Sequence, residues 1–506
     1  MSANTPIPVI DLFAGPGGLG EGFSSARVRS KPRFRLALSV ECDPHAHKTL
    51  ELRAFCREFT GSDRKLPKAY FEFLREEISR EDLFKRHPDE AEAARLEAMQ
   101  ATLGESISDG SIARRLDELQ SQIDFRRAVM IGGPPCQAYS LVGRSRMAKA
   151  RASGAYREEE DGRHVLYRQY LKLIQRIKPA AFVMENVRGI LSSRYQDRPI
   201  FQQILDDLSG AGYDLHALGD RSGDTLFSDT DPKSFLVMAS KYGVPQRRAR
   251  VFIVGTRRDL RITELRRPEP LRGVRPPTVE SAIGTLPRVR SGLSGGDDEA
   301  EWKAEVRDCA ARLAKEVPRS EELLRGVLTS IASSTSKLPS RRSERRVPGD
   351  GSGTDELVLN HETRGHIPSD LERYLFFATW GRVRGQSPTL LNLPHRLLPD
   401  HENVRLAAEA QAMDELAFTD RFRVQVENEP SSTITSHISK DGHHFIHPDP
   451  RQCRSLTVRE AARLQTFPDD YFFCGPRTEQ YRQVGNAVPP VLAQQIAECV
   501  LSAVAP

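Results

Sequence analysis

The stretch between residues 8 and 41 constrains the fold of this 506-residue chain more than any other. An apolar run, residues 8–13, is followed by a glycine-rich segment, residues 15–20, and a second apolar run, residues 34–40, ends at Glu41. We expect a helix to begin near Gly18, between the two runs. A strand, a glycine turn, a helix and a second strand that ends in an acid are typical of the nucleotide-binding half of a doubly wound sheet.

The same alternation continues further along the chain. Residues 128–131, 180–184 and 251–254 predict three more strands, and an amphipathic helix is expected over residues 166–177. Strands that alternate with helices indicate an α/β fold with a parallel, doubly wound sheet. Residues 51–125 are rich in Glu, Arg, Ala and Leu, so we interpret them as a helical insertion within this domain.

The length of the chain favours more than one domain, because a single core rarely grows beyond about 250–300 residues. We assign residues 1–260 to the sheet domain. Arg and Pro dominate residues 261–277, and a run of Ser, Arg and Gly over 333–355 predicts a flexible segment. A smaller, irregular domain is therefore expected over 261–453, followed by a return to the first domain over 454–506.

Two helices are expected in that return. Thr457 suits the position before a helix, and Glu460 follows three residues later, which is the pattern of a capping box. A final helix is predicted to begin at Pro489 and Pro490, because proline is favoured in a first helical turn.

Charge and cysteine content limit the class of protein. The chain carries 74 Lys and Arg against 69 Asp and Glu, which permits a polyanionic partner without requiring one. No apolar run is expected to cross a bilayer, and residues 1–8 lack the pattern of a secretory signal. The seven cysteines are scattered and form no Cys-x-x-Cys pair, so reduced thiols in the cytoplasm are the consistent interpretation.

Cys136 lies directly after the predicted strand at 128–131 and beside two prolines. A thiol held at the end of a buried strand is a candidate nucleophile. Most free cysteines in folded proteins are instead small packing residues. Taken by itself, the segment leaves both interpretations open.

Six motifs with chemical character occur in order along the chain. They occupy residues 11–18, 132–137, 184–187, 246–250, 456–465 and 483–490. Together they resemble the ordered motif set of the DNA (cytosine-5)-methyltransferases, over residues 8–50, 128–255 and 430–500. The resemblance implies a Rossmann-like, S-adenosylmethionine-dependent methyltransferase domain with a smaller target-recognition domain. It also implies sequence-specific methyl transfer to C5 of a cytosine that is flipped out of the duplex.

The resemblance assigns catalytic roles to four residues. Cys136 attacks C6 of the cytosine, which makes C5 nucleophilic through a covalent intermediate. Glu185 holds or protonates N3 and binds the exocyclic amine. Arg248 and Arg250 hold cytosine O2, the catalytic carboxylate and nearby phosphate, for which a guanidinium fork is well suited.

The resemblance also assigns a cofactor site for S-adenosylmethionine. Its residues are Asp11, Phe13, Ala14, Gly15, Gly17, Gly18, Glu41, which binds ribose, and Asn486, which closes the pocket. The chain departs from the family at Cys42, where a bulky apolar residue is frequent. The acidic residue that usually binds the adenine amine cannot be placed, and Asp109 is only a weak candidate.

Contacts with double-stranded DNA are expected from two regions. A mobile loop after Cys136 carries Arg144, Arg146 and Lys149, which can contact phosphates. Residues 360–366 resemble the family's lead-in to the target-recognition region. The three imidazoles of His443, His444 and His447 have no acidic or thiol partner in the sequence, so no metal site is expected.

Several alternatives stay open at this stage. An RNA cytosine-5 methyltransferase shares the catalytic motifs, although a recognition region the size of a domain favours DNA. An NAD-dependent oxidoreductase explains the glycine turn and Glu41 but leaves the other motifs unexplained. An inactive DNA-binding regulator conflicts with intact Cys136, Glu185 and Arg250. A methyltransferase of this kind is expected near the nucleoid, with a cognate restriction endonuclease linked genetically rather than physically.

Overall fold

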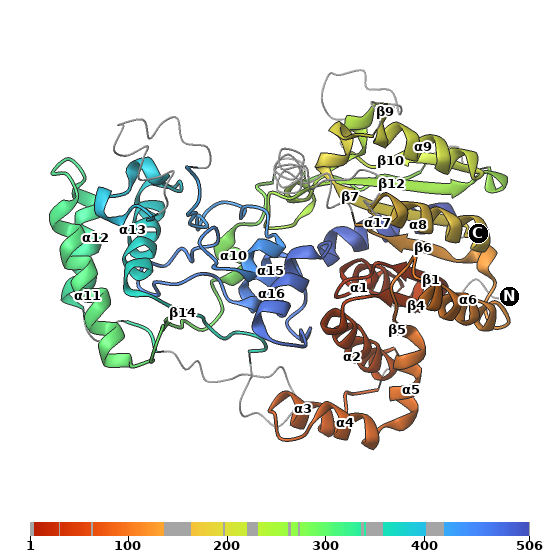
Figure 1. Cartoon of the computed structure of the whole chain (residues 1–506), viewed down its shortest axis with the longest axis horizontal. Coiled ribbons are helices and arrows are strands. Elements are labelled where there is room, and N and C mark those ends of the chain that lie inside the picture. The colour runs from red at the N-terminus through yellow and green to blue at the C-terminus, as the bar shows by residue number, and fades with distance from the viewer. Residues whose placement is uncertain are drawn as a thin grey trace. The chain divides into compact units, whose positions relative to one another are not determined.

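The computed structural model describes residues 5–29, 31–61, 64–135, 163–195, 198–219, 231–261, 265–271, 274–334, 338–340, 358–400 and 419–504. Its central feature is an eight-stranded sheet in the order β10-β12-β7-β6-β1-β4-β5, with β11 paired to β12 (Figure 1). The strands are β1 Ile7–Leu12, β4 Phe34–Glu41, β5 Ala98–Gln100, β6 Val129–Gly132, β7 Ala181–Val187, β10 Tyr213–Ala217, β11 Leu236–Met238 and β12 Ala249–Arg257.

β1 is the switch point of the sheet: the strands that follow it in sequence are added first on one side of it and then on the other. It pairs in parallel with β4 on one side and with β6 on the other. The pairs β4/β5 and β6/β7 are also parallel, whereas β12 runs antiparallel to β7 and β10. The predicted doubly wound α/β fold is therefore confirmed. In such sheets, ligands bind beyond the carboxyl ends of the strands at the point where the direction changes.

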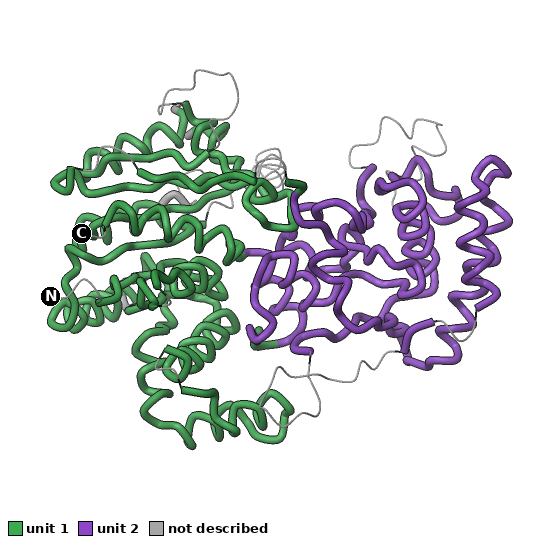
Figure 2. Tube along the Cα trace, turned by 180° about the vertical axis from the view of Figure 1, so that it is seen from behind, with its two compact units in different colours: residues 1–275, 473–475, 487–506 green, residues 276–472, 476–486 purple. Residues whose placement is uncertain are grey.

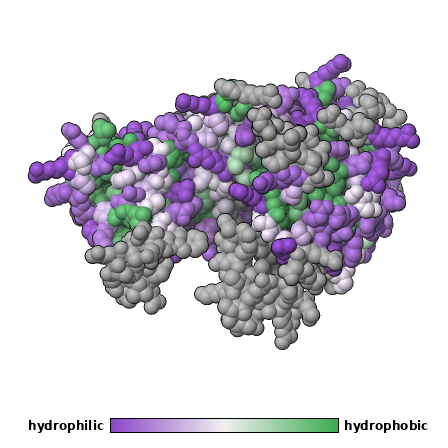
Figure 3. All heavy atoms as spheres, turned by 90° about the horizontal axis from the view of Figure 1, so that it is seen from above, coloured by the Kyte–Doolittle hydropathy of each residue, from purple (hydrophilic) through white to green (hydrophobic). Residues whose placement is uncertain are grey.

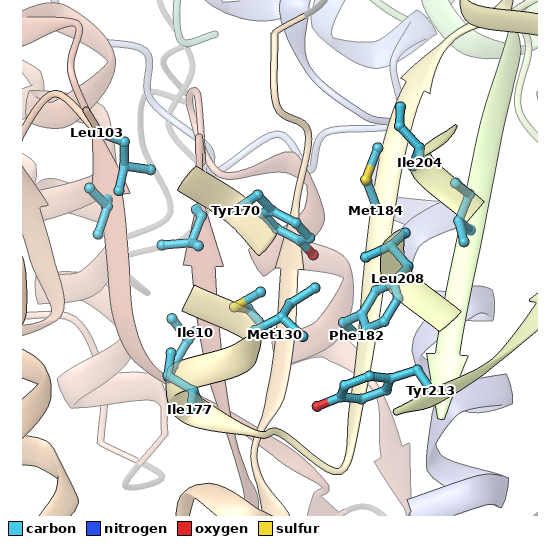
Figure 4. Packing of buried hydrophobic residues seen from close by; sticks show 14 of the residues in the cluster. Ile10, Leu103, Met130, Tyr170, Ile177, Phe182, Met184, Ile204, Leu208 and Tyr213 are labelled. Atoms are coloured by element: carbon cyan, nitrogen blue, oxygen red, sulfur yellow. The ribbon is translucent and has the colours of Figure 1, made fainter. Parts of the chain in front are cut away.

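Helices pack on both faces of the sheet. The described helices of this part of the chain are α1 Gly18–Ser25, α2 Pro44–Thr60, α3 Lys68–Leu74, α4 Arg80–Arg86, α5 Pro88–Glu97, α6 Ser106–Gln120, α8 Arg163–Ile177, α9 Ile200–Gly210 and α17 Pro490–Val504. One apolar cluster joins α6, α8 and α9 to the sheet, with Tyr170 and Leu208 beside Phe182 (Figure 4). A second cluster joins α1 and α17 to the sheet, with Phe23 and Ile496 among its residues. Burial on both faces explains the continuous apolar runs of the strands.

One strand of the sheet lies where only helix was expected. β5 pairs in parallel with β4, and Gln100 lies opposite Glu41. The following helix, α6, contributes Leu116 to the core. The stretch expected as a helical insertion, 51–125, thus contains part of α2, the helices α3 to α6 and also the short strand β5. The three residues of β5 favour helix by themselves, and pairing with β4 outweighs this preference.

The chain forms two compact units (Figure 2). Unit 1 comprises residues 1–275, 473–475 and 487–506, and unit 2 comprises residues 276–472 and 476–486. The second unit thus begins later than the expected 261, and most of the expected return from 454 groups with unit 2. Most of the predicted flexible segment 333–355 lies outside the described residues.

The regular secondary structure described in unit 2 is mainly helix, joined by long irregular segments. Its helices are α10 Val279–Ile283, α11 Glu299–Glu316, α12 Glu322–Ser333, α13 Pro368–Arg384, α15 Val458–Leu464 and α16 Arg477–Asn486. A parallel pair of short strands, β13 Gly292–Leu293 and β14 Gly365–His366, lies before α11 and α13. Trp302, Leu328 and Phe377 belong to the apolar core that α11, α12 and α13 share. This core has no residue in common with the clusters of the sheet domain.

A buried charge pair anchors α15 in unit 2. Thr457 and Glu460 form the predicted capping box, in which each side chain accepts from the other's backbone N–H. The Glu460 carboxylate also accepts two hydrogen bonds from Arg454, at 2.6 and 2.7 Å, and both side chains are only 1% exposed. Arg454 donates further to the backbone oxygen of Val289. The capping-box prediction is confirmed, and the pair explains why this segment groups with unit 2.

Hydrophilic residues cover most of the described surface on the face drawn in Figure 3, and hydrophobic residues form small patches between them. Among the residues that the structure describes, Leu323 and Val274 are the large apolar side chains with the greatest exposure, at 73% and 65%. Single exposed apolar side chains of this kind are normal and define no site.

One helical stretch, Arg477–Val504, is long and apolar enough to cross a membrane by length and composition alone, although no such run was expected. Within it, α17 places Leu492, Ile496 and Val500 in the core of the sheet domain. In the most apolar window of the stretch, 61% is buried inside the protein. Packing of a core helix accounts for this hydropathy.

Candidate active site

The predicted catalytic and cofactor residues of unit 1 gather at the carboxyl ends of neighbouring strands. The glycine turn follows β1, Glu41 ends β4, and residues 133–135 follow β6. Glu185 lies two residues before the end of β7. The parallel pairing of these four strands brings segments from distant parts of the sequence to one edge of the sheet.

The turn after β1 has an unusual backbone. Phe13 has a φ of 56°, in the left-handed region that bulky residues rarely adopt. Gly15 and Gly17 also have positive φ, at 57° and 92°, and Gly17 precedes α1. No atom lies within 4 Å of the position where a Cβ of Gly15 would be, so its backbone faces open space. Strained residues of this kind cluster at ligand sites, which supports the prediction for Phe13.

Two backbone amides and a thiol fix the carboxylate of Glu41. The N–H of Gly15 donates to Oε2 at 2.7 Å, and the N–H of Asp43 donates to Oε1 at 2.8 Å. The exposed Cys42 lies with Sγ 3.5 Å from Oε1. Partial desolvation and the neighbouring Glu41 charge raise the pKa of the Cys42 thiol to about 11. The carboxylate is thus oriented at the edge of the glycine turn before any ligand binds.

Not every predicted cofactor residue faces the open side of this turn. Asp11 is 0% exposed, and burial together with the charge of Glu41 raises its pKa well above the usual value. A Cβ on Gly18 would lie 2.2 Å from the backbone oxygen of Val488, so Gly18 allows close packing of two backbones. Ala14 is buried with Leu50. These three residues lie beneath the turn and support it.

Glu185 and Arg250 form an ion pair across two strands. The distance between Arg250 Nε and Glu185 Oε1 is 2.9 Å, and both side chains are largely buried. The antiparallel register of β7 and β12 places Arg250 opposite Val187, two residues from Glu185. Burial lowers the pKa of Arg250, and the Glu185 carboxylate opposes this shift. The pair presents a carboxylate whose Oε1 is held by a fixed cation.

Arg248 has a different environment from Arg250. Its side chain is 1% exposed, and burial followed by repulsion from Arg250 lowers its pKa well below the usual value. The structure therefore places Arg248 inside the protein, where direct contact with a base or phosphate requires rearrangement. This burial favours a role in which Arg248 supports Arg250 over the predicted role in which Arg248 contacts the base or phosphate itself.

Five of the predicted site residues lie outside the described part of unit 1. Cys136, Arg144, Arg146 and Lys149 lie outside the described residues. Asn486 ends α16 and belongs to unit 2, whereas the turn and Glu41 belong to unit 1.

The three histidines considered as metal ligands have protein partners. Nδ1 of His443 lies 2.7 Å from the Tyr374 hydroxyl, and Nδ1 of His444 lies 3.1 Å from the backbone oxygen of Asp420. His447 Nε2 lies 3.4 Å from Glu460. No cluster of three metal-ligating side chains occurs in the part of the chain that the structure describes.

Two neighbours of the site, Gly133 and Gln100, were not predicted as site residues. Gly133 lies beside the Glu185 carboxylate. Gln100 ends β5 beside Glu41, with an exposed side chain. The sequence around Gln100 favours helix, and only sheet pairing identifies the position.

Comparisons with known proteins identify the family of the chain. The family of C-5 cytosine-specific DNA methylases matches residues 106–502. The type II methyltransferase M.Bpa9945I of Bacillus paralicheniformis is 34% identical, over 97% of this chain and 98% of its own length. M.AgeI of Thalassovita gelatinovora is 28% identical over 98% of this chain and 99% of its own. M1.HphI of Haemophilus parahaemolyticus is 25% identical over 97% of this chain and 86% of its own.

Proposed function

The chain belongs to the C-5 cytosine-specific DNA methylase family and is a DNA cytosine-5 methyltransferase, and from this premise we propose that it acts through a covalent bond between Cys136 and cytosine C6. The observation that carries the proposal is the Glu185–Arg250 pair at the carboxyl edge of the sheet, next to the segment that leads to Cys136. A largely buried, oriented carboxylate at that place suits recognition of a base better than a solvated surface pair does.

The chemistry follows from the low reactivity of cytosine C5. The thiolate of Cys136 adds to C6, and the electron pair of the C5–C6 bond becomes available at C5. Glu185 holds N3 and the exocyclic amine while charge develops on the ring, and Arg250 keeps the carboxylate in place. After methyl transfer, loss of the C5 proton and release of the thiolate restore the aromatic ring. Arg248 acts from beneath Arg250 as a supporting residue.

The residues after β1 and β4 fit S-adenosylmethionine. The oriented Glu41 carboxylate suits two vicinal ribose hydroxyls, and the open backbone at Gly15 leaves room for close approach. Phe13, Gly17 and the exposed Gln100 complete the set at this edge, with Gln100 a candidate for the adenine amine. When bound, the cofactor supplies an electrophilic methyl group. Asn486 is proposed to close the pocket from the C-terminal side.

We propose double-stranded DNA as the substrate. Unit 2 is the target-recognition region, and Arg144, Arg146 and Lys149 contact phosphates. The family that matches the chain is described as acting on DNA, which favours DNA over the RNA alternative. The relatives are named type II methyltransferases, so protection of cytoplasmic, nucleoid DNA from a cognate endonuclease is the proposed biological role.

The test combines one variant with one trapping experiment. Cys136→Ser is expected to abolish methyl transfer to DNA while it still binds S-adenosylmethionine, because only the nucleophile is removed. A duplex that carries 5-fluorocytosine at the target is expected to form a covalent adduct with the wild type, since fluorine replaces the proton that must leave. Cys136→Ala serves as the control and is expected to form no adduct. Methyl transfer by Cys136→Ser at the wild-type rate would refute the thiol mechanism.

The target is found by base-resolution mapping of 5-methylcytosine in cells that express the wild type or Cys136→Ser. New methylation in one DNA sequence context is expected only with the wild type. Methylation found on RNA, with none on DNA, would favour the RNA alternative.

A further inference from the structure

Two reciprocal contacts join the segment after β6 to the end of β7. β6 and β7 are parallel neighbours with Gly132 opposite Met184, so the next residues, Gly133 and Glu185, also come close together. A Cβ on Gly133 would lie 3.0 Å from Glu185 Oε2. In return, the side-chain amide of Asn186 donates to the backbone oxygen of Pro134 at 3.3 Å. We call Gly133, Pro134, Glu185 and Asn186 the β6–β7 clasp.

The clasp leaves the Glu185 carboxylate little room to move. Arg250 holds Oε1 at 2.9 Å on one side, and the α-carbon of Gly133 borders Oε2 on the other. A methyl group on Gly133 would push Oε2 by a few tenths of an ångström, because 3.0 Å is closer than ordinary van der Waals contact. The atom that the methyl group would contact, Oε2, lies at the end of the Glu185 side chain, so the backbone of β7 need not move. The disturbance falls on the carboxylate and its bond to Arg250.

Asn186 supplies a donor to the Pro134 carbonyl, beyond the last paired residue of β6. Pro134 and Pro135 have no N–H, so the segment after β6 cannot donate to the ladder through these residues. Asn186 is 5% exposed, donates to Pro134 and accepts from the N–H of Val187 at 2.8 Å. An amide side chain provides the donor and the acceptor that this position needs.

We propose that Gly133 and Asn186 are positioning residues for methyl transfer: Gly133 leaves the space that Glu185 Oε2 occupies, and Asn186 fixes the Pro134 peptide beside it. This inference rests on the proposed function of Glu185. Because a misplacement of about 1 Å costs about 100-fold in rate, a shift of a few tenths is expected to cost about tenfold.

The first experiment measures single-turnover methylation of target DNA by Gly133→Ala and by the matched control Gly210→Ala. Gly210 lies at the end of α9 with nothing within 4 Å of its Cβ position. Gly133→Ala is expected to react about tenfold more slowly. Its affinities for S-adenosylmethionine and DNA, and its urea midpoint, are expected to match those of the wild type. Gly210→Ala is expected to react at the wild-type rate. A wild-type rate for Gly133→Ala would overturn the role of Gly133.

A double-variant cycle separates positioning from a general structural effect. In Glu185→Asp the carboxylate is one methylene shorter and no longer reaches Gly133, so adding Gly133→Ala is expected to change the rate less than twofold. An equal tenfold loss in both backgrounds would show that Gly133 acts independently of Glu185. Activity of Cys136→Ser would instead refute the proposed function, so the two failures are distinguishable.

Asn186 has its own isosteric test. Asn186→Asp keeps the acceptor for Val187 but turns the donor toward Pro134 into an oxygen, so the methylation rate is expected to fall at least tenfold. Asn392→Asp is the control, because among the described residues the Asn392 side chain acts as an acceptor, for the N–H and hydroxyl of Thr389. Its activity is expected to be unchanged. Equal activity of both variants would overturn the role of Asn186.

Discussion

Replacement of Glu460 by Gln is expected to destabilise unit 2 strongly. The substitution keeps the size of the side chain but removes the charge that neutralises Arg454, and both residues are 1% exposed. Two Arg454 hydrogen bonds and one from the Thr457 N–H converge on this carboxylate, at 2.6 to 2.7 Å. Removal of one partner from a buried pair costs about 3–5 kcal/mol, because the other charge stays buried without compensation.

Tryptophan fluorescence is the appropriate assay for this loss. The chain has two tryptophans, Trp302 and Trp380, and both lie in unit 2. The emission therefore reports unfolding of unit 2 in urea without a tryptophan signal from unit 1. With an m-value of about 2–3 kcal/mol/M, a loss of about 3–5 kcal/mol lowers the urea midpoint by about 1–2.5 M.

Glu362→Gln is the matched control in the same unit. Glu362 pairs with Arg477 at 3.5 Å, but its side chain is largely exposed, so the same chemical change is expected to cost less than about 1 kcal/mol. If Glu460→Gln moves the midpoint no further than Glu362→Gln does, the buried pair does not stabilise unit 2 as argued.

Three further predictions concern pH and the cofactor. Burial lowers the pKa of His447 from 6.5 to about 4. As the pH falls, His447 is therefore protonated in the unfolded chain at a higher pH than in the folded chain. The free energy of unfolding of unit 2 is expected to drop between pH 6.5 and 4, by up to about 3 kcal/mol, and His447→Asn is expected to flatten this dependence in urea titrations. The pKa of Asp11 is raised in the folded state, so the free energy of unfolding falls as the pH rises above the pKa of Asp11 in the unfolded chain. The stability of Asp11→Asn relative to wild type, followed by circular dichroism, is expected to increase from pH 4 to 7.5; an equal difference at both pH values would contradict this. Glu41→Gln is expected to weaken S-adenosylmethionine binding about 10- to 100-fold in calorimetry, because hydrogen bonds to a charged acceptor are lost. Wild-type affinity would exclude Glu41 from the cofactor site.

Local sequence patterns predicted the elements whose signal is contained within a few residues. The run at 8–13 and the glycines after it predicted β1 and the turn into α1, because strand burial and positive φ depend on neighbouring residues. Thr457 and Glu460 predicted their helix for the same reason. β5 was missed because its three residues favour helix and become a strand only by pairing with β4.

The sequence by itself determined which residue types are available for catalysis, their order, and the doubly wound sheet that collects them at one edge. Only the tertiary structure decided how they meet. The antiparallel register of β7 and β12 brings Arg250 beside Glu185, since a strand's direction is not encoded in the strand's own residues. The space at Gly133 and the bond from Asn186 depend on the pairing of β6 with β7, which joins residues about 50 positions apart.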